Sequence, residues 1–208
     1  MNHRRAAVLT AATIAAAVWG RHRMATWGTT PAERMGPMPG DDLVDTPLIQ
    51  VTRAVRIAAP AEDVWPWIAQ IGSHELGRAG WYSYDRFDNG GVPSARELLP
   101  DVGEPAVGDT LVADPDFAWT VRAVEPGHAL VLDLRPPGKV DMYVSFTLAV
   151  ESDGAHRCRL VERSRWDMRP RWVGVPLSLA FEPIDFVMMR QHLLGVRARA
   201  EGTLGPTG

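Results

Sequence analysis

The sequence predicts an α+β domain in which a meander of antiparallel strands is followed by one long C-terminal helix. Between Val107 and Met168, apolar and polar residues alternate in short runs that are separated by tight turns, as expected for strands. The later segment Phe181 to Glu201 has a proline and an acidic residue near its start and two arginines near its end. These residues are typical of a helix of about five turns.

The chain before the meander predicts one strand and two short helices. Residues Ile49 to Ala58 alternate as a strand, and Arg53 falls on its apolar face. The sequence AEDVWPWIAQIG then predicts a short helix, which Pro66 bends or divides. The aromatic sequence GWYSYDRFDNGG indicates a second short helix or a lid-like loop.

Five further strands are predicted, of which the last two are the longest and are joined by a turn of the Asp-Gly kind in SDGA. On the final strand, Glu162 and Ser164 share a face with apolar residues, and the arginines of the other face are expected to be solvated. The five predicted ranges are Asp109 to Ala113, Phe117 to Glu125, His128 to Arg135, Asp141 to Glu151 and His156 to Met168.

The apolar residues of the C-terminal helix form two stripes on nearly opposite sides. We expect the first stripe, with Gln191 inside it, to face the sheet, and the second to be covered by the Pro- and Gly-rich residues 24 to 48. A solvent-facing second stripe would instead indicate a membrane surface or a protein partner. The first stripe is Ile184, Val187, Met188 and Leu194, and the second is Phe186, Met189, Leu193 and Val196.

The N-terminal residues 6–20 form an uncharged, Ala-rich run with arginines on both sides. It suits a single membrane anchor of undecided orientation, although it is shorter than a comfortable span of about 20 residues. A signal peptide and a soluble helix are the alternatives, and the last would leave the protein cytoplasmic. We therefore divide the chain into this segment (1–23), a surface linker (24–48), the domain (49–202) and a flexible tail (203–208).

Composition excludes several classes of function. A net charge of −3 with scattered basic residues argues against nucleic acid as a partner. A single cysteine, Cys158, excludes an internal disulfide framework. No metal site is predicted, because the histidines are isolated in sequence, and no catalytic or phosphate-binding motif is present. We expect a monomer without a cofactor.

The order of the elements resembles the helix-grip architecture of the START-like, polyketide cyclase and SRPBCC superfamily. The sequences IAAPAEDVWPWIAQIG, GWYSYDRFDN, VGDTL, EPGHALVL and LLGVRARAE resemble an actinobacterial SRPBCC family of uncharacterised function. The resemblance implies a curved antiparallel sheet of six to seven strands around the terminal helix. It also implies a cavity between them for a hydrophobic small molecule or lipid, but no particular reaction.

In such a sheet the first and last strands are antiparallel neighbours, so Arg53 and Glu162 are predicted to meet on the concave face. A buried charge is costly unless it is paired or in contact with a ligand. If the protein were a cyclase or aromatase, Glu162 would be a candidate general base, and Arg53 and Tyr84 would stabilise an enolate. A bulge that turns either charge to solvent, or a purely structural ion pair, is the alternative.

The leading hypothesis is binding of a hydrophobic small molecule or lipid without catalysis. An enzyme of the cyclase kind and an interaction module that uses the second helix stripe are the alternatives. Aromatic residues near the expected cavity mouth can contact a ligand or can simply pack the short helices onto the sheet. The predicted ligand-binding residues are Trp67, Trp81, Tyr82, Tyr84, Trp119, Phe146, Trp166, Met188 and Gln191.

Overall fold

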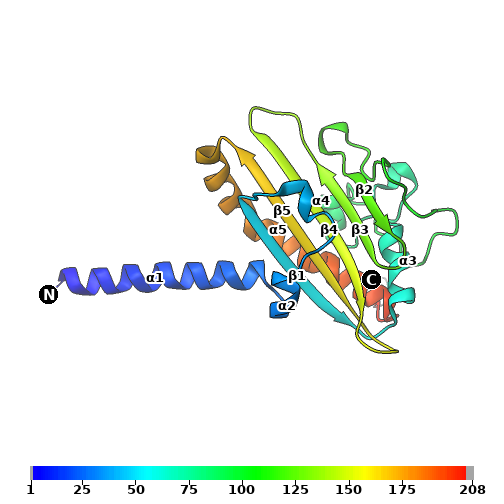
Figure 1. Ribbon diagram of the computed structural model, residues 1–208, viewed down its shortest axis with the longest axis horizontal. Helices are drawn as coiled ribbons and strands as arrows, with labels where there is room; N and C mark the ends of the chain where they lie inside the picture. The colour runs from blue at the N-terminus through cyan, green and yellow to red at the C-terminus, as the bar shows by residue number, and fades with distance from the viewer. Residues whose placement is uncertain (1, 205–208) are drawn as a thin grey trace.

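The computed structural model describes residues 2–204, with side chains from Val8 onward. Five strands form one antiparallel sheet in the order β1-β5-β4-β3-β2, so that the first and last strands are neighbours (Figure 1). The strands are β1 (Ile49–Ile57), β2 (Thr120–Glu125), β3 (Ala129–Leu134), β4 (Asp141–Ser152) and β5 (Cys158–Arg169).

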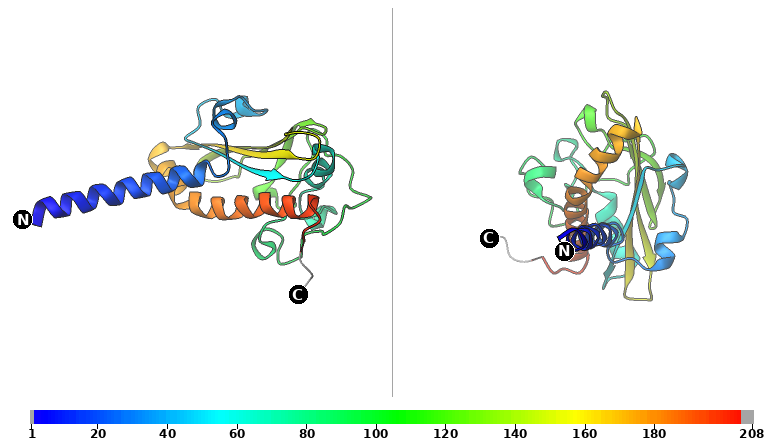
Figure 2. Two further views of the ribbon diagram at one scale, coloured as in Figure 1. Left: turned by 90° about the horizontal axis from the view of Figure 1, so that it is seen from below. Right: turned by 90° about the vertical axis from the view of Figure 1, so that its left-hand side faces the viewer.

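The helices complete a helix-grip fold, in which a long C-terminal helix lies against one face of the sheet (Figure 2). Two short helices follow β1, as the sequence predicts. The α-helices are α1 (Asn2–Ala25), α2 (Pro31–Met35), α3 (Ala61–Ala69), α4 (Asp85–Asp88) and α5 (Arg171–Ala200). Three 3-10 turns are η1 (Asp41–Val44), η2 (His74–Leu76) and η3 (Pro115–Phe117).

The sheet has five strands rather than the six to seven expected. The predicted strand Asp109 to Ala113 is reduced to an isolated bridge between Thr110 and Thr120. Its backbone still bonds to the chain around β2, through Leu111 N to the Trp119 carbonyl. The pairing ends there because η3 turns the chain away directly afterwards.

The C-terminal helix begins earlier than predicted, at Arg171 rather than Phe181. Its first half contains Pro176 and Pro183, which sequence reasoning placed in a connection and in a first turn. Both prolines lie on the exposed side of the helix. The carbonyl groups that lose their helical hydrogen bonds belong to Trp172 and Leu179, which are exposed residues, so water can replace those bonds and the helix continues.

The two stripes of α5 do not face the partners predicted for them, although Leu194 of the first stripe packs against the core. Leu193 and Val196 of the second stripe are fully buried in the core, whereas Ile184 and Val187 of the first are 60% and 48% exposed. The buried face also includes polar residues, among them His192. The predicted interaction surface on the second stripe is therefore wrong, because the sheet itself covers it.

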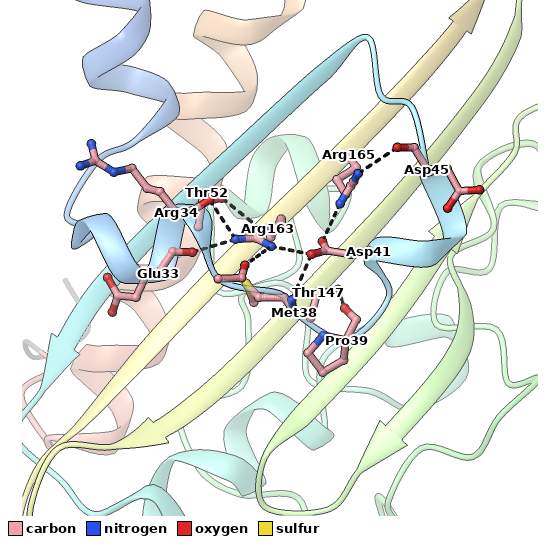
Figure 3. A network of polar contacts seen from close by, with 11 residues as sticks. Glu33, Arg34, Met38, Pro39, Asp41, Asp45, Thr52, Thr147, Arg163 and Arg165 are labelled. Carbon is pink, nitrogen blue, oxygen red and sulfur yellow. Dashed lines mark hydrogen bonds and ion pairs between the residues drawn. The ribbon is translucent and has the colours of Figure 1, made fainter.

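Residues 31–45 lie on the outer face of the sheet and not over α5 (Figure 2), although Trp27, which precedes them, packs against the core and lies under Arg190 of α5. Arg163 of β5 holds residues 31–45 there, with an ion pair of 2.7 Å to Asp41 and hydrogen bonds to the carbonyls of Glu33 and Gly36 (Figure 3). The Thr147 hydroxyl of β4 donates to the Pro39 carbonyl. Of the four outer arginines predicted to be solvated, Arg159, Arg163 and Arg165 bind residues 31–45, whereas Arg157 is exposed as predicted.

Helix α1 projects away from the body at the end where β5 leads into α5 (Figures 1 and 2). Its large apolar side chains are exposed, including Leu9, Ile14 and Trp19. Within the described residues, however, α5 is the one helix long and apolar enough to cross a membrane. Its second half packs in the core, so α5 does not span as a whole. Of the tail predicted at 203–208, residues 205–208 lie outside the described residues.

Candidate functional site

A cluster of charged side chains lies on the concave face of the sheet, where this fold otherwise needs only apolar residues. Arg53 is at the centre of β1, and the register places it opposite Glu162 of β5. The distance between Arg53 Nη1 and Glu162 Oε2 is 3.5 Å, and neither side chain is more than 1% exposed. The predicted meeting of these two residues is confirmed.

A third member of the cluster, Asp185 of α5, was not predicted. Its Oδ2 lies 2.7 Å from Arg53 Nη2. Sequence reasoning assigned Asp185 to the positive end of the helix. A helical repeat of three and four residues nevertheless joins Glu182, Asp185, His192 and Val196 into one face, and this pattern was the signal available.

The base of α1 closes the side of the cluster between β1 and α5. Arg53 Nε donates to the Met24 carbonyl at 3.1 Å. Three residues earlier in the chain, Arg21 binds Glu182 of α5 through two hydrogen bonds of 2.5 and 2.7 Å. The N-terminal helix is therefore joined by charged groups to the same side of α5 that carries Asp185.

The cluster holds one guanidinium and two carboxylates, so its full ionisation would leave a buried negative charge. The pKa of Glu162 is raised to about 7, chiefly by burial, with the charge of Arg53 acting to lower it and the charge of Asp185 to raise it. Burial also raises the pKa of Asp185. Because Arg53 compensates only one carboxylate, the other favours its protonated form near neutral pH.

Part of the hydrogen-bonding capacity of the cluster is unused. The Ser164 hydroxyl donates to Glu162 Oε1 at 2.6 Å. Arg53 Nη1 and Glu162 Oε2 are buried and form no hydrogen bond with any described residue. These two atoms lie 3.5 Å apart in the ion pair, so each retains the capacity for one hydrogen bond to a further polar group.

The third proposed catalytic residue, Tyr84, does not join this cluster. It precedes α4 and is 42% exposed, and no hydrogen bond connects it with Arg53 or Glu162 in the described part of the chain. Its neighbour Tyr82 is buried, and the Tyr82 hydroxyl accepts a hydrogen bond from Gln70 at 2.7 Å. The Tyr82 hydroxyl is therefore hydrogen-bonded inside the core, although Tyr82 was predicted to contact a ligand.

The remaining predicted ligand residues divide between the core and its margin. Trp67 packs edge-on against Tyr82 at a ring distance of 6.1 Å, and Trp119 lies 5.7 Å from Phe146. Trp67 and Phe146 are buried. The half-buried residues are Trp81, Trp119, Trp166, Met188 and Gln191.

His192 of α5 is fully buried and is not among the residues predicted for the site. Its ring stacks on Tyr82 at 6.4 Å and meets Phe146 edge-on, and its Nδ1 is bonded to the Trp81 carbonyl. Burial lowers the pKa of His192 to about 4, so the ring is neutral at physiological pH. Gly195, one turn further along, allows the Tyr82 backbone to approach the helix closely.

Where a cavity was expected between sheet and helix, His192 of α5 packs against Tyr82 and against Phe146 of β4. Two cavities, of about 340 and 440 Å³, open elsewhere on the surface. The smaller lies over Arg122, Asp133 and Tyr143 on the outer side of the sheet, and the larger lies at the base of α1. A ligand at the charged cluster would require α5 or the base of α1 to move outward.

Fold and site together define a helix-grip domain with an ionic cluster buried on its concave face. Neither a protein-family model nor a curated protein sequence matches the chain. Among solved structures, it is similar to protein MLL2253 from Mesorhizobium loti, with 17% identity, coverage of 74% of this chain and 98% of that chain, and a TM-score of 0.48.

Two further similarities are of the same order. One is norcoclaurine synthase from Thalictrum flavum in complex with dopamine and hydroxybenzaldehyde, with 17% identity, 76% and 91% coverage and a TM-score of 0.43. The other is a protein from Thermobifida fusca, with 16% identity, 74% and 94% coverage and a TM-score of 0.45. These values describe a shared course of the chain and say nothing about the chemistry of this protein.

Proposed function

We propose that this protein binds a small hydrophobic molecule with a polar or ionisable end between the sheet and α5. The observation that carries the proposal is the cluster of Arg53, Glu162 and Asp185, with a donor and an acceptor left without hydrogen bonds. The polar end of the ligand would meet Arg53 and Glu162. The aromatic residues and Met188 around the concave face would contact its apolar part.

Stability alone is a poor explanation for these charges. Replacing a buried ion pair by apolar residues of similar volume is often neutral or stabilising by about 1–4 kcal/mol. The same sheet has an arginine on its outer face, Arg163, whose nitrogens are all hydrogen-bonded, so a buried arginine of this sheet can be fully bonded. A ligand group that forms hydrogen bonds with Arg53 Nη1 and Glu162 Oε2 would explain why these charges are buried on the concave face.

The helix-grip architecture and the sequence segments that resemble SRPBCC proteins support membership of that superfamily, which we include in the proposal. A cyclase-like reaction is the second candidate, and one observation favours it. The raised pKa of Glu162 is that of a group able to exchange a proton near pH 7. With Tyr84 outside the cluster, Arg53 is the remaining group to stabilise an enolate.

We further propose that the domain is held at a membrane by α1. Its apolar residues are exposed on all sides, and the first 32 residues contain arginines but no acidic residue. The first half of α5 exposes more apolar surface at the same end of the molecule, with Trp172 at 80%. The acidic residues of that half, Glu182 and Asp185, are turned inward and paired with arginines.

The test of ligand binding is native mass spectrometry of the full-length protein after expression in its own host. The triple variant Arg53→Met, Glu162→Leu and Asp185→Leu should remain folded and lose the co-purifying molecule. Its matched control is Arg122→Met with Asp133→Leu, which removes an ion pair of 2.7 Å from the outer face and should keep the molecule. Equal ligand content in both variants, or repeated wild-type preparations without any ligand, would contradict the proposal.

A further inference from the structure

The larger surface cavity, of about 440 Å³, lies between the end of α1 and α2, outside the proposed ligand site. Three of its seven lining residues carry basic side chains, namely His22, Arg23 and Arg34, and none is acidic. The other lining residues are Thr26, Trp27, Gly28 and Thr29. Basic side chains that converge on a concave surface next to hydroxyl groups are suited to a compact anion.

The basic side chains are not committed to other groups. Arg34 and His22 form no side-chain hydrogen bond or ion pair with any described residue, and Arg23 only lies over the Trp19 ring at 5.8 Å. The nearest acid along the chain, Glu33, is already bound by Arg159 through contacts of 2.7 and 2.9 Å. The positive charge of the cavity is therefore not neutralised by the protein.

The negative end of α1 is also compensated. A helix C-terminus disfavours an anion because its last carbonyl groups are unpaired. Here the His22 carbonyl accepts from the Thr26 backbone and hydroxyl, at 3.1 and 2.7 Å, and the Met24 carbonyl accepts from Arg53. The lining side chains thus set the sign of the charge that the cavity attracts.

The cavity also has a defined position relative to the apolar part of α1. At about 1.5 Å per residue, Arg23 and Thr26 lie roughly 5 and 9 Å beyond Gly20, where the uncharged run ends. The polar layer on each side of a bilayer is about 5–8 Å thick. If residues 6–20 lie in a membrane, the cavity lies at the level of the lipid phosphates.

We propose that this cavity binds a phosphate group, of the kind carried by lipid headgroups and by soluble phosphate esters. Arg23 and Arg34 donate to the phosphate oxygens, and His22 adds a further donor. The lipid source rests on the proposed membrane association of α1, whereas the phosphate chemistry does not. A headgroup held here would fix the height of the domain above the bilayer through contacts that α1 alone lacks.

The experiment uses the full-length protein and the double variant Arg23→Gln with Arg34→Gln. Inorganic phosphate is titrated first, with the guanidinium resonances of ¹⁵N-arginine-labelled protein as the readout. We expect the Arg34 resonance of the wild type to shift, and the affinity for phosphate to fall at least tenfold in the double variant. Arg86→Gln, which removes one charge from an exposed position on α4, is the control and should bind as the wild type does.

Vesicles then distinguish the two sources of phosphate. Co-sedimentation is measured with phosphatidylcholine alone and with about one part phosphatidylglycerol to three parts phosphatidylcholine. Loss of the preference for phosphatidylglycerol in the double variant, without competition by free phosphate, identifies a lipid headgroup. Competition by free phosphate identifies a soluble ester.

Two results would overturn the proposal. One is equal binding of phosphate and of both kinds of vesicle by wild type and double variant. The other is a phosphate titration that moves no arginine resonance near the cavity. If no vesicle sediments the wild type, the proposed tether fails, while the phosphate titration still decides the cavity.

Discussion

Two arginines, Arg53 and Arg163, are equally buried on adjacent strands but face opposite sides of the sheet. The side chain of Arg53 is 1% exposed and that of Arg163 is 2% exposed. On the outer face, Arg163 donates to the Thr52 hydroxyl, to Asp41 and to three backbone carbonyls (Figure 3). On the concave face, Arg53 Nη1 forms no hydrogen bond with any described residue.

This difference separates a structural use of a buried charge from a functional one. Arg163 fastens residues 31–45 to the sheet and has every nitrogen bonded, so nothing further needs to bind there. Arg53 has two carboxylate partners, one of them at the longer distance of 3.5 Å. Burial alone therefore does not identify a site. Arg53 differs from Arg163 in its unused hydrogen-bonding capacity and in the second buried carboxylate beside it.

The largest expected effect is that of Arg53→Met, which leaves Glu162 and Asp185 buried without a cation. We expect a loss of about 3–5 kcal/mol in the free energy of unfolding at pH 8. The loss should shrink at pH 5, because both carboxyl groups can then be protonated. Urea unfolding at the two pH values measures it, and an equal loss at both would show that the cluster carries no uncompensated charge.

Arg163→Met should destabilise the protein by about 3 kcal/mol, since it leaves the Thr52 hydroxyl and three partly buried carbonyls without this donor and Asp41 with Arg165 as its remaining arginine partner. Residues 31–45 should then exchange amide hydrogens faster, while the concave face stays protected. Hydrogen exchange read by mass spectrometry separates the two faces. A loss of protection across α5 instead would mean that the faces are not independent.

The pH dependence of stability should contain two opposing contributions of about 3 kcal/mol each. The pKa of Glu162 is raised from 4.5 to about 7, so its contribution is complete below pH 4.5 and is lost as the pH rises to 7. The pKa of His192 is lowered from 6.5 to about 4, so its contribution is complete above pH 6.5 and is lost as the pH falls to 4.

Glu162→Gln removes the first contribution and leaves the second. The stability of this variant, measured by urea unfolding, should rise steadily from pH 4 to pH 6.5, whereas that of the wild type should be flatter across the same range. Parallel curves for the two proteins would contradict the raised pKa of Glu162 and weaken the distinction between the two faces.

The smallest effect on stability is expected for Trp172→Asp, below about 0.5 kcal/mol, because the side chain is exposed. Vesicle co-sedimentation should nevertheless weaken several-fold if the first half of α5 touches lipid. Val107→Asp, at another exposed apolar position, is the control and should leave binding unchanged. Equal behaviour of the two variants would restrict membrane contact to α1.

The sequence predicted the sheet and the Arg53–Glu162 pair because both depend on regular alternation and antiparallel register. The alternation of side chains placed Arg53 and Glu162 on the inner face. Because the first and last strands are neighbours in the sheet, the two residues lie opposite each other. It did not predict Asp185, since the angle and position of a helix on a sheet depend on packing across the whole core. The start of α5 was missed because two prolines are tolerated only where the freed carbonyls are exposed.

The outer face was misjudged for a related reason. Arginines at alternate positions of a strand are the usual pattern of a face exposed to solvent. The segment that covers Arg163 lies more than 100 residues earlier in the chain, so the local pattern could not reveal it. Nothing local indicated that residues 31–45 return to this face. The signal that was present, Asp41 in a Pro- and Gly-rich stretch, is common in ordinary loops.

The most direct test of the central claim compares the guanidinium resonances of Arg53 and Arg163 in ¹⁵N-arginine-labelled protein. Spectra are recorded for protein as purified from its host and after extraction with organic solvent and refolding. The Arg53 resonances should shift when the bound molecule is removed, while those of Arg163 stay in place. Unchanged Arg53 resonances, in a preparation shown by mass spectrometry to have lost a ligand, would contradict the assignment of the binding site to the concave cluster.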